Sequence, residues 1–151
     1  CAEHNVLFII NDHLDLALAV DADGLHLGQD DLPIKLARQL LPIDKILGSS
    51  VRTLEQATTA QAEGADYIAV GSIYPSPSKE TAEVVGLERL RQIRQAVTLS
   101  LVAIGGINQG NVAQVLAAGA DAVAVISAVL GAKDIEEASH QIVGKFKVKN
   151  G

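Results

Sequence analysis

Cysteine and aromatic residues are scarce in this sequence of 151 residues. One cysteine, Cys1, excludes both a disulfide within the chain and a metal cluster built from cysteines, and a reducing cytoplasm is the expected location. Aromatic residues make up 3% of the chain although 48% of it is hydrophobic, so the core must consist of Val, Ile, Leu and Ala. Such a core is typical of a parallel sheet covered by helices, which favours an α/β fold.

Basic residues and long apolar runs are also few. Twelve Lys and Arg stand against eighteen Asp and Glu, which gives a net charge of −6 and argues against nucleic acid as a partner. The sequence has neither a run of about 18 apolar residues nor a basic segment before an apolar one, so no membrane span or signal peptide is expected. Small phosphorylated substrates stay compatible with this charge, because local Lys and backbone N–H groups bind phosphate.

Short apolar runs alternate with segments of helical spacing, which predicts βαβ units and a parallel sheet in a single domain, residues 1–151. The predicted strands are 6–10, 24–27, 45–48, 67–70, 101–104 and 122–126. The predicted helices are 14–20, 33–41, 54–63, 87–97 and 111–118, and a short apolar turn and a closing helix at 135–147 follow the last strand.

A recurring helix-to-strand return indicates which α/β architecture the chain adopts. Gly64-Ala65-Asp66 and Gly119-Ala120-Asp121 each precede a predicted strand, and Asp21-Ala22-Asp23 is a looser copy. Glycine at such a position supplies a left-handed helix cap. One repeated βα unit favours a (β/α) barrel over a doubly wound sheet, although periodicity alone leaves both open. In a barrel, the residues just past the strand ends form the active-site face.

Carboxylates follow the first two predicted strands. Asp12 comes after the first and Asp31 after the second. Two carboxylates at one edge of a sheet suit Mg²⁺, which completes its octahedron with water and substrate phosphate. Asn and Asp are also favoured at helix N-caps, so capping is the alternative interpretation of both residues.

Three further strand ends carry groups that bind phosphate. The fourth predicted strand leads into segment 71–79, in which three serines precede Lys79, although an ordinary solvent loop has the same composition. Gly105 and Gly106 after the fifth strand let the backbone approach a ligand, or merely form a tight turn. The N–H groups near Ser127 begin a short helix, and loops after the last two strands of barrels frequently form a phosphate site.

The histidines form no catalytic motif. His26 lies inside a predicted strand, where a core histidine with satisfied hydrogen bonds is the expected role. His4, His13 and His140 follow no spacing pattern. Fingerprints of zinc hydrolases, of Ser-His-Asp triads and of dinucleotide binding do not occur in the sequence, so these functions have no support.

Four segments stand in order along nearly the whole chain: FIIND at 8–12, ADGLHLGQDD at 22–31, GADYIAVGSIYP at 64–75 and VAIGGI at 102–107. Together they resemble the thiamine-phosphate synthase family. The resemblance implies a (β/α)8 TIM barrel and a Mg²⁺-dependent transferase. It also implies a condensation of 4-amino-2-methyl-5-hydroxymethylpyrimidine diphosphate with 4-methyl-5-(2-phosphoethyl)thiazole, or its carboxylated form, to thiamine phosphate and pyrophosphate. In the family's dissociative mechanism diphosphate leaves first, and the thiazole nitrogen captures the pyrimidine carbocation.

The resemblance also implies a role for each candidate residue. Asp12 and Asp31 bind Mg²⁺, Asn11 and Lys79 contact the diphosphate, and Ser50 lies beside the transferring pyrimidine, which makes Ser50 and Lys79 the expected catalytic residues. The thiazole phosphate is bound by Ser76, Ser78, Gly106, Ile126 and Ser127. The family usually has Thr where this chain has Ser76 and Ser78, and each serine keeps the hydroxyl.

The family has two further βα units before the strand that ends in Asn11-Asp12, and the second contains a Gln-x-Arg-x-Lys motif that grips the diphosphate. We therefore expect this sequence to supply about six of the eight units, the C-terminal three quarters of the barrel, with the first two missing. The two exposed sheet edges would favour a homo-oligomer. Two alternative functions stay open: a thiazole tautomerase paralogue, which has a histidine where this chain has Ser72, and a catalytically inactive binder of phosphate ligands.

Overall fold

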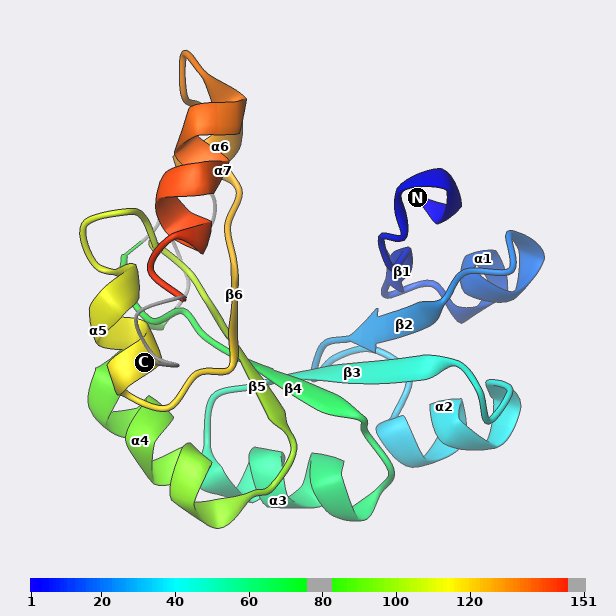
Figure 1. Cartoon of the computed structure of the whole chain (residues 1–151). Coiled ribbons are helices and arrows are strands. Elements are labelled where there is room, and N and C mark those ends of the chain that lie inside the picture. The colour runs from blue at the N-terminus through cyan, green and yellow to red at the C-terminus, as the bar shows by residue number, and fades with distance from the viewer. Residues whose placement is uncertain (76–82, 147–151) are drawn as a thin grey trace.

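The computed structural model describes residues 1–75 and 83–146. In these residues six parallel strands form one curled sheet, a half-barrel in which each strand pairs with the next along the chain (Figure 1). The strands are β1 Ile9–Asn11, β2 Gly24–Leu27, β3 Ile46–Val51, β4 Tyr67–Val70, β5 Ser100–Ile104 and β6 Ala122–Ala124. A doubly wound sheet reverses its strand order, so this sequential order identifies the barrel-type α/β architecture. That two βα units are missing stays a prediction.

Helices connect the strands, and α2 to α5 cover the convex face of the sheet (Figure 1). They are the 3₁₀ helix η1 Ala2–His4 and the α-helices α1 Leu14–Ala19, α2 Ile34–Leu40, α3 Leu54–Ala62, α4 Gly86–Ala96, α5 Val112–Ala117, α6 Ser127–Leu130 and α7 Ile135–Val143. Parallel pairing sets Leu27 opposite Ser49 and Val51 opposite Val70. The strands therefore end at a common edge, where the polar residues that follow them meet.

The core lies between the sheet and these helices. Leu25 and Leu47 from the sheet and Leu90 and Ile93 from α4 are completely buried. Alternate strand residues face the helices, so each strand contributes every second side chain to this layer. Burial of each such side chain stabilises the fold by about 1.5–3 kcal/mol.

The two closest copies of the helix-to-strand return share one set of contacts. In each, an aspartate before the strand accepts a hydrogen bond from an N–H at the start of the preceding strand and pairs with an arginine. The contacts are Asp66 Oδ2 with Leu47 N (2.7 Å) and Arg38 Nη1 (3.2 Å), and Asp121 Oδ2 with Leu101 N (2.9 Å) and Arg94 Nη1 (2.9 Å). Gly64 and Gly119, two residues earlier, have φ values of 97° and 110°, which glycine adopts without strain.

The third, looser copy keeps the aspartate but changes its neighbours. Asp23 Oδ2 accepts a hydrogen bond from Phe8 N at 2.7 Å. The left-handed position is taken by Asp21, at φ 50°, because Asp tolerates this region better than most residues. Asp21 pairs with Lys45 at 2.6 Å. One repeated βα unit therefore accounts for all three returns.

Several predicted boundaries were wrong, and the strand ladder explains why. Residues 6–8 were predicted as strand, but Val6 and Leu7 lie before β1, 57% and 63% exposed, because pairing with β2 begins at Ile9. β3 was predicted to end at Gly48 but extends to Val51, since its last residues pair with β4.

The C-terminal part also departs from prediction. β6 was predicted to reach residue 126 but ends at Ala124, the last residue that pairs with β5. The apolar turn predicted after it is the one-turn helix α6. The closing helix α7 ends at Val143 rather than at 147, a residue outside the described part.

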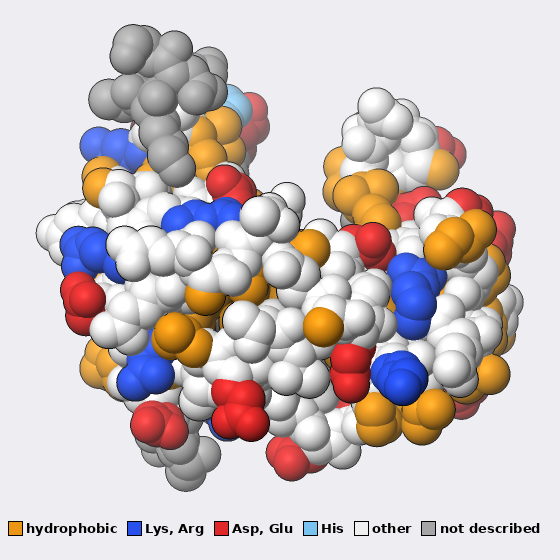
Figure 2. Space-filling model, turned by 90° about the horizontal axis from the view of Figure 1, so that it is seen from below, with side chains coloured by type: hydrophobic (Ala, Val, Ile, Leu, Met, Phe, Trp, Pro, Cys, Tyr) orange, Lys and Arg blue, Asp and Glu red, His pale blue; other side chains and the backbone are white. Residues whose placement is uncertain are grey.

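Acidic and basic side chains are interspersed on the face seen from below (Figure 2). Local pairs such as Arg91 with Glu88 on α4, at 3.3 Å, contribute little because both partners are exposed. Among the described residues, no helix is both long and apolar enough to cross a membrane.

Candidate functional site

A pocket of about 440 Å³ lies at the carboxyl ends of the strands. Residues that follow all six strands line it. Seven predicted site residues are among them: Asn11, Asp12, Asp31, Ser50, Gly106, Ile126 and Ser127. Ser76, Ser78 and Lys79 lie outside the described residues. The fold therefore gathers at one pocket every predicted site residue that the structure describes.

Asp12 and Asp31 enter the pocket from neighbouring strands. Asp12 follows β1 in a left-handed conformation, with φ 67°, and its backbone N–H donates to the His26 carbonyl at 2.8 Å. Asp31 Oδ2 accepts a hydrogen bond from Gly28 N at 2.6 Å, which fixes the turn after β2. The helices that follow begin at other caps, His13 and Pro33, without a side-chain cap bond. The capping interpretation of the two aspartates is therefore wrong.

The two carboxylates influence each other electrostatically. Partial desolvation raises the pKa of Asp12 above its ordinary value, and the nearby carboxylate of Asp31 raises it further. Two facing carboxylates that repel each other attract a cation between them. Because the Gly28 N–H engages Asp31 Oδ2, the other oxygen of Asp31 stays available as a ligand. The pair suits a hard cation such as Mg²⁺, which needs only one or two protein carboxylates.

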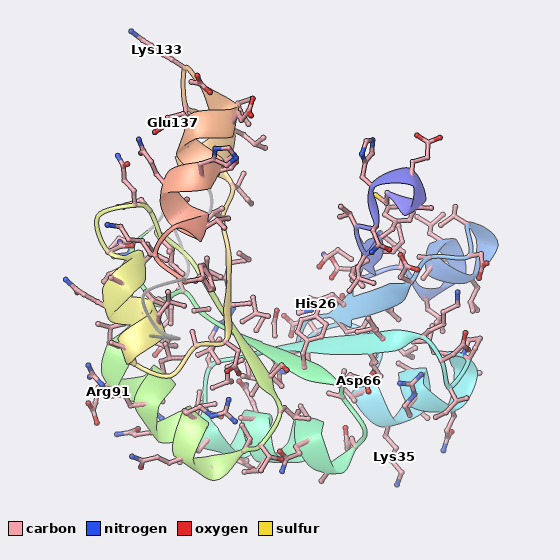
Figure 3. All side chains as sticks on the ribbon, in the orientation of Figure 1. His26, Lys35, Asp66, Arg91, Lys133 and Glu137 are labelled. Atoms are coloured by element: carbon pink, nitrogen blue, oxygen red, sulfur yellow. The ribbon has the colours of Figure 1, made fainter. Side chains whose placement is uncertain are left out.

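Ser50 belongs to a short chain of hydrogen-bonded side chains. Its Oγ lies 2.9 Å from His26 Nε2, and His26 Nδ1 lies 2.8 Å from the Tyr67 hydroxyl. His26 points from β2 to the concave side of the sheet (Figure 3). A side chain on Gly48 would collide with the Tyr67 ring, so glycine at this position lets the ring reach His26. His26 is thus a core histidine with both ring nitrogens hydrogen-bonded, as the sequence predicted.

Burial sets the charge of this chain of side chains. It lowers the pKa of His26 below 6.5, although Asp31 partly opposes the shift, and it raises the pKa of Tyr67. His26 is therefore neutral near pH 7, with one nitrogen donating and the other accepting. A neutral imidazole that is hydrogen-bonded at both nitrogens fixes the direction of the Ser50 hydroxyl without adding charge to the pocket.

The glycine pair after β5 forms a tight turn that also lines the pocket. Gly105 and Gly106 have φ values of 100° and 61°. A side chain on Gly106 would meet Tyr74 and the Pro75 carbonyl, so the backbone is closely covered on that side. Asn111 Nδ2 donates to the Gly106 carbonyl at 3.0 Å. The predicted tight turn is therefore confirmed and lies at the pocket, and ligand binding by these glycines stays a prediction.

Arg52 also lines the pocket, although it was not among the residues predicted from the sequence. The sequence predicted that the third strand ends at Gly48, four residues before Arg52. Because β3 runs to Val51, Arg52 is the residue directly past the strand. The strand-end rule would have found it had the boundary been correct.

A family model described as thiamine monophosphate synthase matches residues 1–129 of the chain. The chain belongs to the thiamine monophosphate synthase family. A thiamine-phosphate synthase from Pyrococcus furiosus is 49% identical over 140 residues, 93% of this chain and 67% of the relative. One from Moorella thermoacetica is 55% identical over 136 residues, 89% of this chain and 65% of the relative. The chain thus spans about two thirds of these relatives, and family membership makes it a transferase of thiamine biosynthesis.

Solved structures agree with the family assignment. A thiamine phosphate pyrophosphorylase from Pyrococcus furiosus superposes with a TM-score of 0.91 at 45% identity, over 99% of this chain and 72% of that one. A structure described as native KDPGal superposes with a TM-score of 0.73 at 15% identity, over 97% of this chain and 71% of that one, and shows the fold alone. The half-barrel of this chain is therefore that of the family.

Proposed function

We propose that this chain condenses 4-amino-2-methyl-5-hydroxymethylpyrimidine diphosphate with 4-methyl-5-(2-phosphoethyl)thiazole, or its carboxylated form, in the pocket at the strand ends. The observation that carries the proposal is that one pocket joins the carboxylates of Asp12 and Asp31 to the glycine turn at Gly106 and the start of α6 at Ser127. Two phosphorylated substrates need two phosphate sites, and the pocket has a candidate at each side. Ser50 lies in β3, between the strands of the two sides in the strand order.

The acidic side of the pocket would bind the diphosphate. Asp12 and Asp31 would hold Mg²⁺, and Asn11 and Lys79 would contact the phosphoryl oxygens. Bound there, Mg²⁺ would neutralise the negative charge of the leaving group. Desolvation and the Asp31 carboxylate raise the pKa of Asp12, and a cation held by the two carboxylates would relieve their mutual repulsion.

The reaction would need charge stabilisation rather than a strong base. The bond between the pyrimidine methylene carbon and the diphosphate oxygen breaks, and its electrons leave with the diphosphate. The thiazole nitrogen then gives its lone pair to the methylene carbon, and with the thiazole that has no carboxylate no proton moves. The carboxylated form would in addition lose CO2 and take up a proton at the carbon that held the carboxylate. Ser50, held by His26 at 2.9 Å, would hydrogen-bond beside the transferring pyrimidine, and Lys79 would stabilise the departing charge.

The opposite side of the pocket would bind the thiazole phosphate. Gly106 lines the pocket there, and Ile126 and Ser127 lie at the start of α6, whose first N–H groups favour an anion. Ser76 and Ser78 would add hydroxyl donors. This division separates the two phosphate groups and directs the thiazole nitrogen toward the pyrimidine.

The alternative functions have less support. A tautomerase of the paralogous type would use a histidine where this chain has Ser72, and no histidine is among the described residues that line the pocket. The compared relatives carry the name thiamine-phosphate synthase. An inactive binder of phosphate ligands would keep the glycine turn but would not turn over both substrates.

The proposal is tested by incubating the protein with both substrates and Mg²⁺. Thiamine phosphate and pyrophosphate should form in equal amounts, and excess EDTA should stop the reaction. Turnover that continues in EDTA would contradict the two-carboxylate metal site. Binding of the thiazole phosphate without any product would favour the inactive binder.

A further inference from the structure

Arg52 is the one cationic side chain among the described residues that line the pocket. Three carboxylates share this lining: Asp12, Asp30 and Asp31. A diphosphate carries several negative charges, and one divalent cation has only two positive charges against the three negative charges of these aspartates. In addition to Lys79, a further positive group would therefore favour binding of the diphosphate, and an arginine guanidinium presents the forked donors that suit phosphate oxygens.

The backbone of Arg52 is held in place while its side chain is not. Its N–H donates to Gln56 Oε1 at 2.8 Å, and the Gln56 N–H donates to Thr53 Oγ1 at 3.1 Å. These two bonds cap the start of α3 and fix the junction with β3. The exposed guanidinium makes no hydrogen bond or ion pair with another described residue, whereas those of Arg38 and Arg94 are engaged by aspartates.

The position of Arg52 indicates which phosphate group it meets. Arg52 directly follows β3, two residues after Ser50, and both residues line the pocket. Gln29 Nε2 donates to the Ser50 carbonyl at 2.7 Å, which ties the end of β3 to the turn that holds Asp31. The glycine turn after β5 lies two strands away and α6 three.

We propose that Arg52 binds the diphosphate of the pyrimidine substrate, and the pyrophosphate released from it, rather than the thiazole phosphate. The proposal rests on the proposed function, since it assigns a further substrate-binding residue to that reaction. Arg52 leaves the chemistry unchanged: it anchors the leaving group on the side of Ser50 that is opposite the thiazole.

The test is calorimetric titration of inorganic pyrophosphate with Mg²⁺ into the wild-type protein, Arg52→Gln, Arg52→Lys and the control Arg89→Gln, which removes an exposed arginine of α4 outside the pocket. Arg52→Gln should weaken pyrophosphate binding about tenfold, the lower range for a charged hydrogen bond. Arg52→Lys should recover part of the loss, and Arg89→Gln should bind as the wild type does. Affinity for the thiazole phosphate should be the same in all four proteins.

Two further measurements separate Arg52 from the fold and from the proposed reaction. The KM for the pyrimidine diphosphate should rise in Arg52→Gln while the melting temperature stays constant. Suppose that the wild type makes thiamine phosphate. If Arg52→Gln then binds pyrophosphate as well as the wild type does, or loses affinity for pyrophosphate and thiazole phosphate equally, only the role of Arg52 is overturned. A wild-type protein that neither binds pyrophosphate nor forms product overturns the proposed function and this inference together.

Discussion

At the scale of single residues, the pocket depends on side chains whose roles are set by their neighbours. Ser50 was singled out by the family resemblance, and it lies within β3, where it pairs with Ala69 of β4. Its contact with His26 joins positions 24 residues apart, which no local pattern predicts. Sequence thus identified the hydroxyl, whereas its orientation follows from the pairing of three strands.

His26 gives the protein a predictable dependence on pH. Because burial lowers the pKa of His26 in the folded state, the unfolded chain takes up a proton near pH 6.5 while the folded protein resists it. This contribution to the free energy of unfolding is complete above pH 6.5 and is lost as the pH falls below it. Urea unfolding measures the free energy of unfolding at about pH 8 and about pH 5.5. Between these two pH values it should fall less in His26→Gln than in the wild type.

The exposed His4 provides the control for this experiment. His4→Gln should retain the pH dependence of the wild type, since residue 4 is exposed in η1. An identical loss of stability in His26→Gln and the wild type would show that His26 is not the responsible group.

Gly106 should tolerate no side chain. Its φ of 61° is unfavourable for a β-branched residue, and a Cβ would meet Tyr74 and the Pro75 carbonyl. Gly106→Val should weaken thiazole-phosphate binding at least about tenfold, measured by calorimetry, and affect pyrophosphate binding much less. Gly110→Ala, which alters a glycine of ordinary φ on the same loop, is the control. Equal loss of both ligands in Gly106→Val would contradict a separate thiazole-phosphate site.

At the scale of elements, the repeated return from helix to strand is what the sequence predicted best. In both Gly-Ala-Asp copies the glycine is in the left-handed region, and the aspartate side chain accepts a hydrogen bond from an N–H of the preceding strand. Strands at 24–27 and 67–70 have the predicted bounds, because both are bordered by such returns. β1 and β6 were misjudged, because each pairs with only one described strand and its length depends on that ladder.

The aspartate of the last return should contribute measurably to stability. Asp121→Ala removes a hydrogen bond to Leu101 N and the pair with Arg94, which should cost about 1–3 kcal/mol of unfolding free energy. Urea denaturation should detect this loss, and the slope of the unfolding free energy against urea concentration should stay unchanged. The exposed Asp44→Ala should cost much less, and equal losses would rule out a special role for the return.

At the scale of the whole molecule, strand order and pocket could be predicted only by combining separate signals. Periodicity predicted six βα units but left barrel and doubly wound sheet open, and the sequential pairing decides between them. The candidate residues lie far apart in sequence, from Asn11 to Ser127, yet they line one pocket because parallel strands end at one edge. Arg52 escaped notice because the end of β3 is a property of the sheet rather than of its own residues.

The central claim is that the two sides of this pocket serve different phosphate groups. The most direct test compares Asp12→Asn with the wild type by following thiamine phosphate formation in a single turnover, with thiazole-phosphate affinity measured on the same samples. Asp12→Asn should slow product formation at least about a hundredfold, because the carboxylate pair that would hold Mg²⁺ is broken, while thiazole-phosphate affinity stays within about twofold. Product formation at the wild-type rate, or a parallel loss of thiazole-phosphate affinity, would contradict the account.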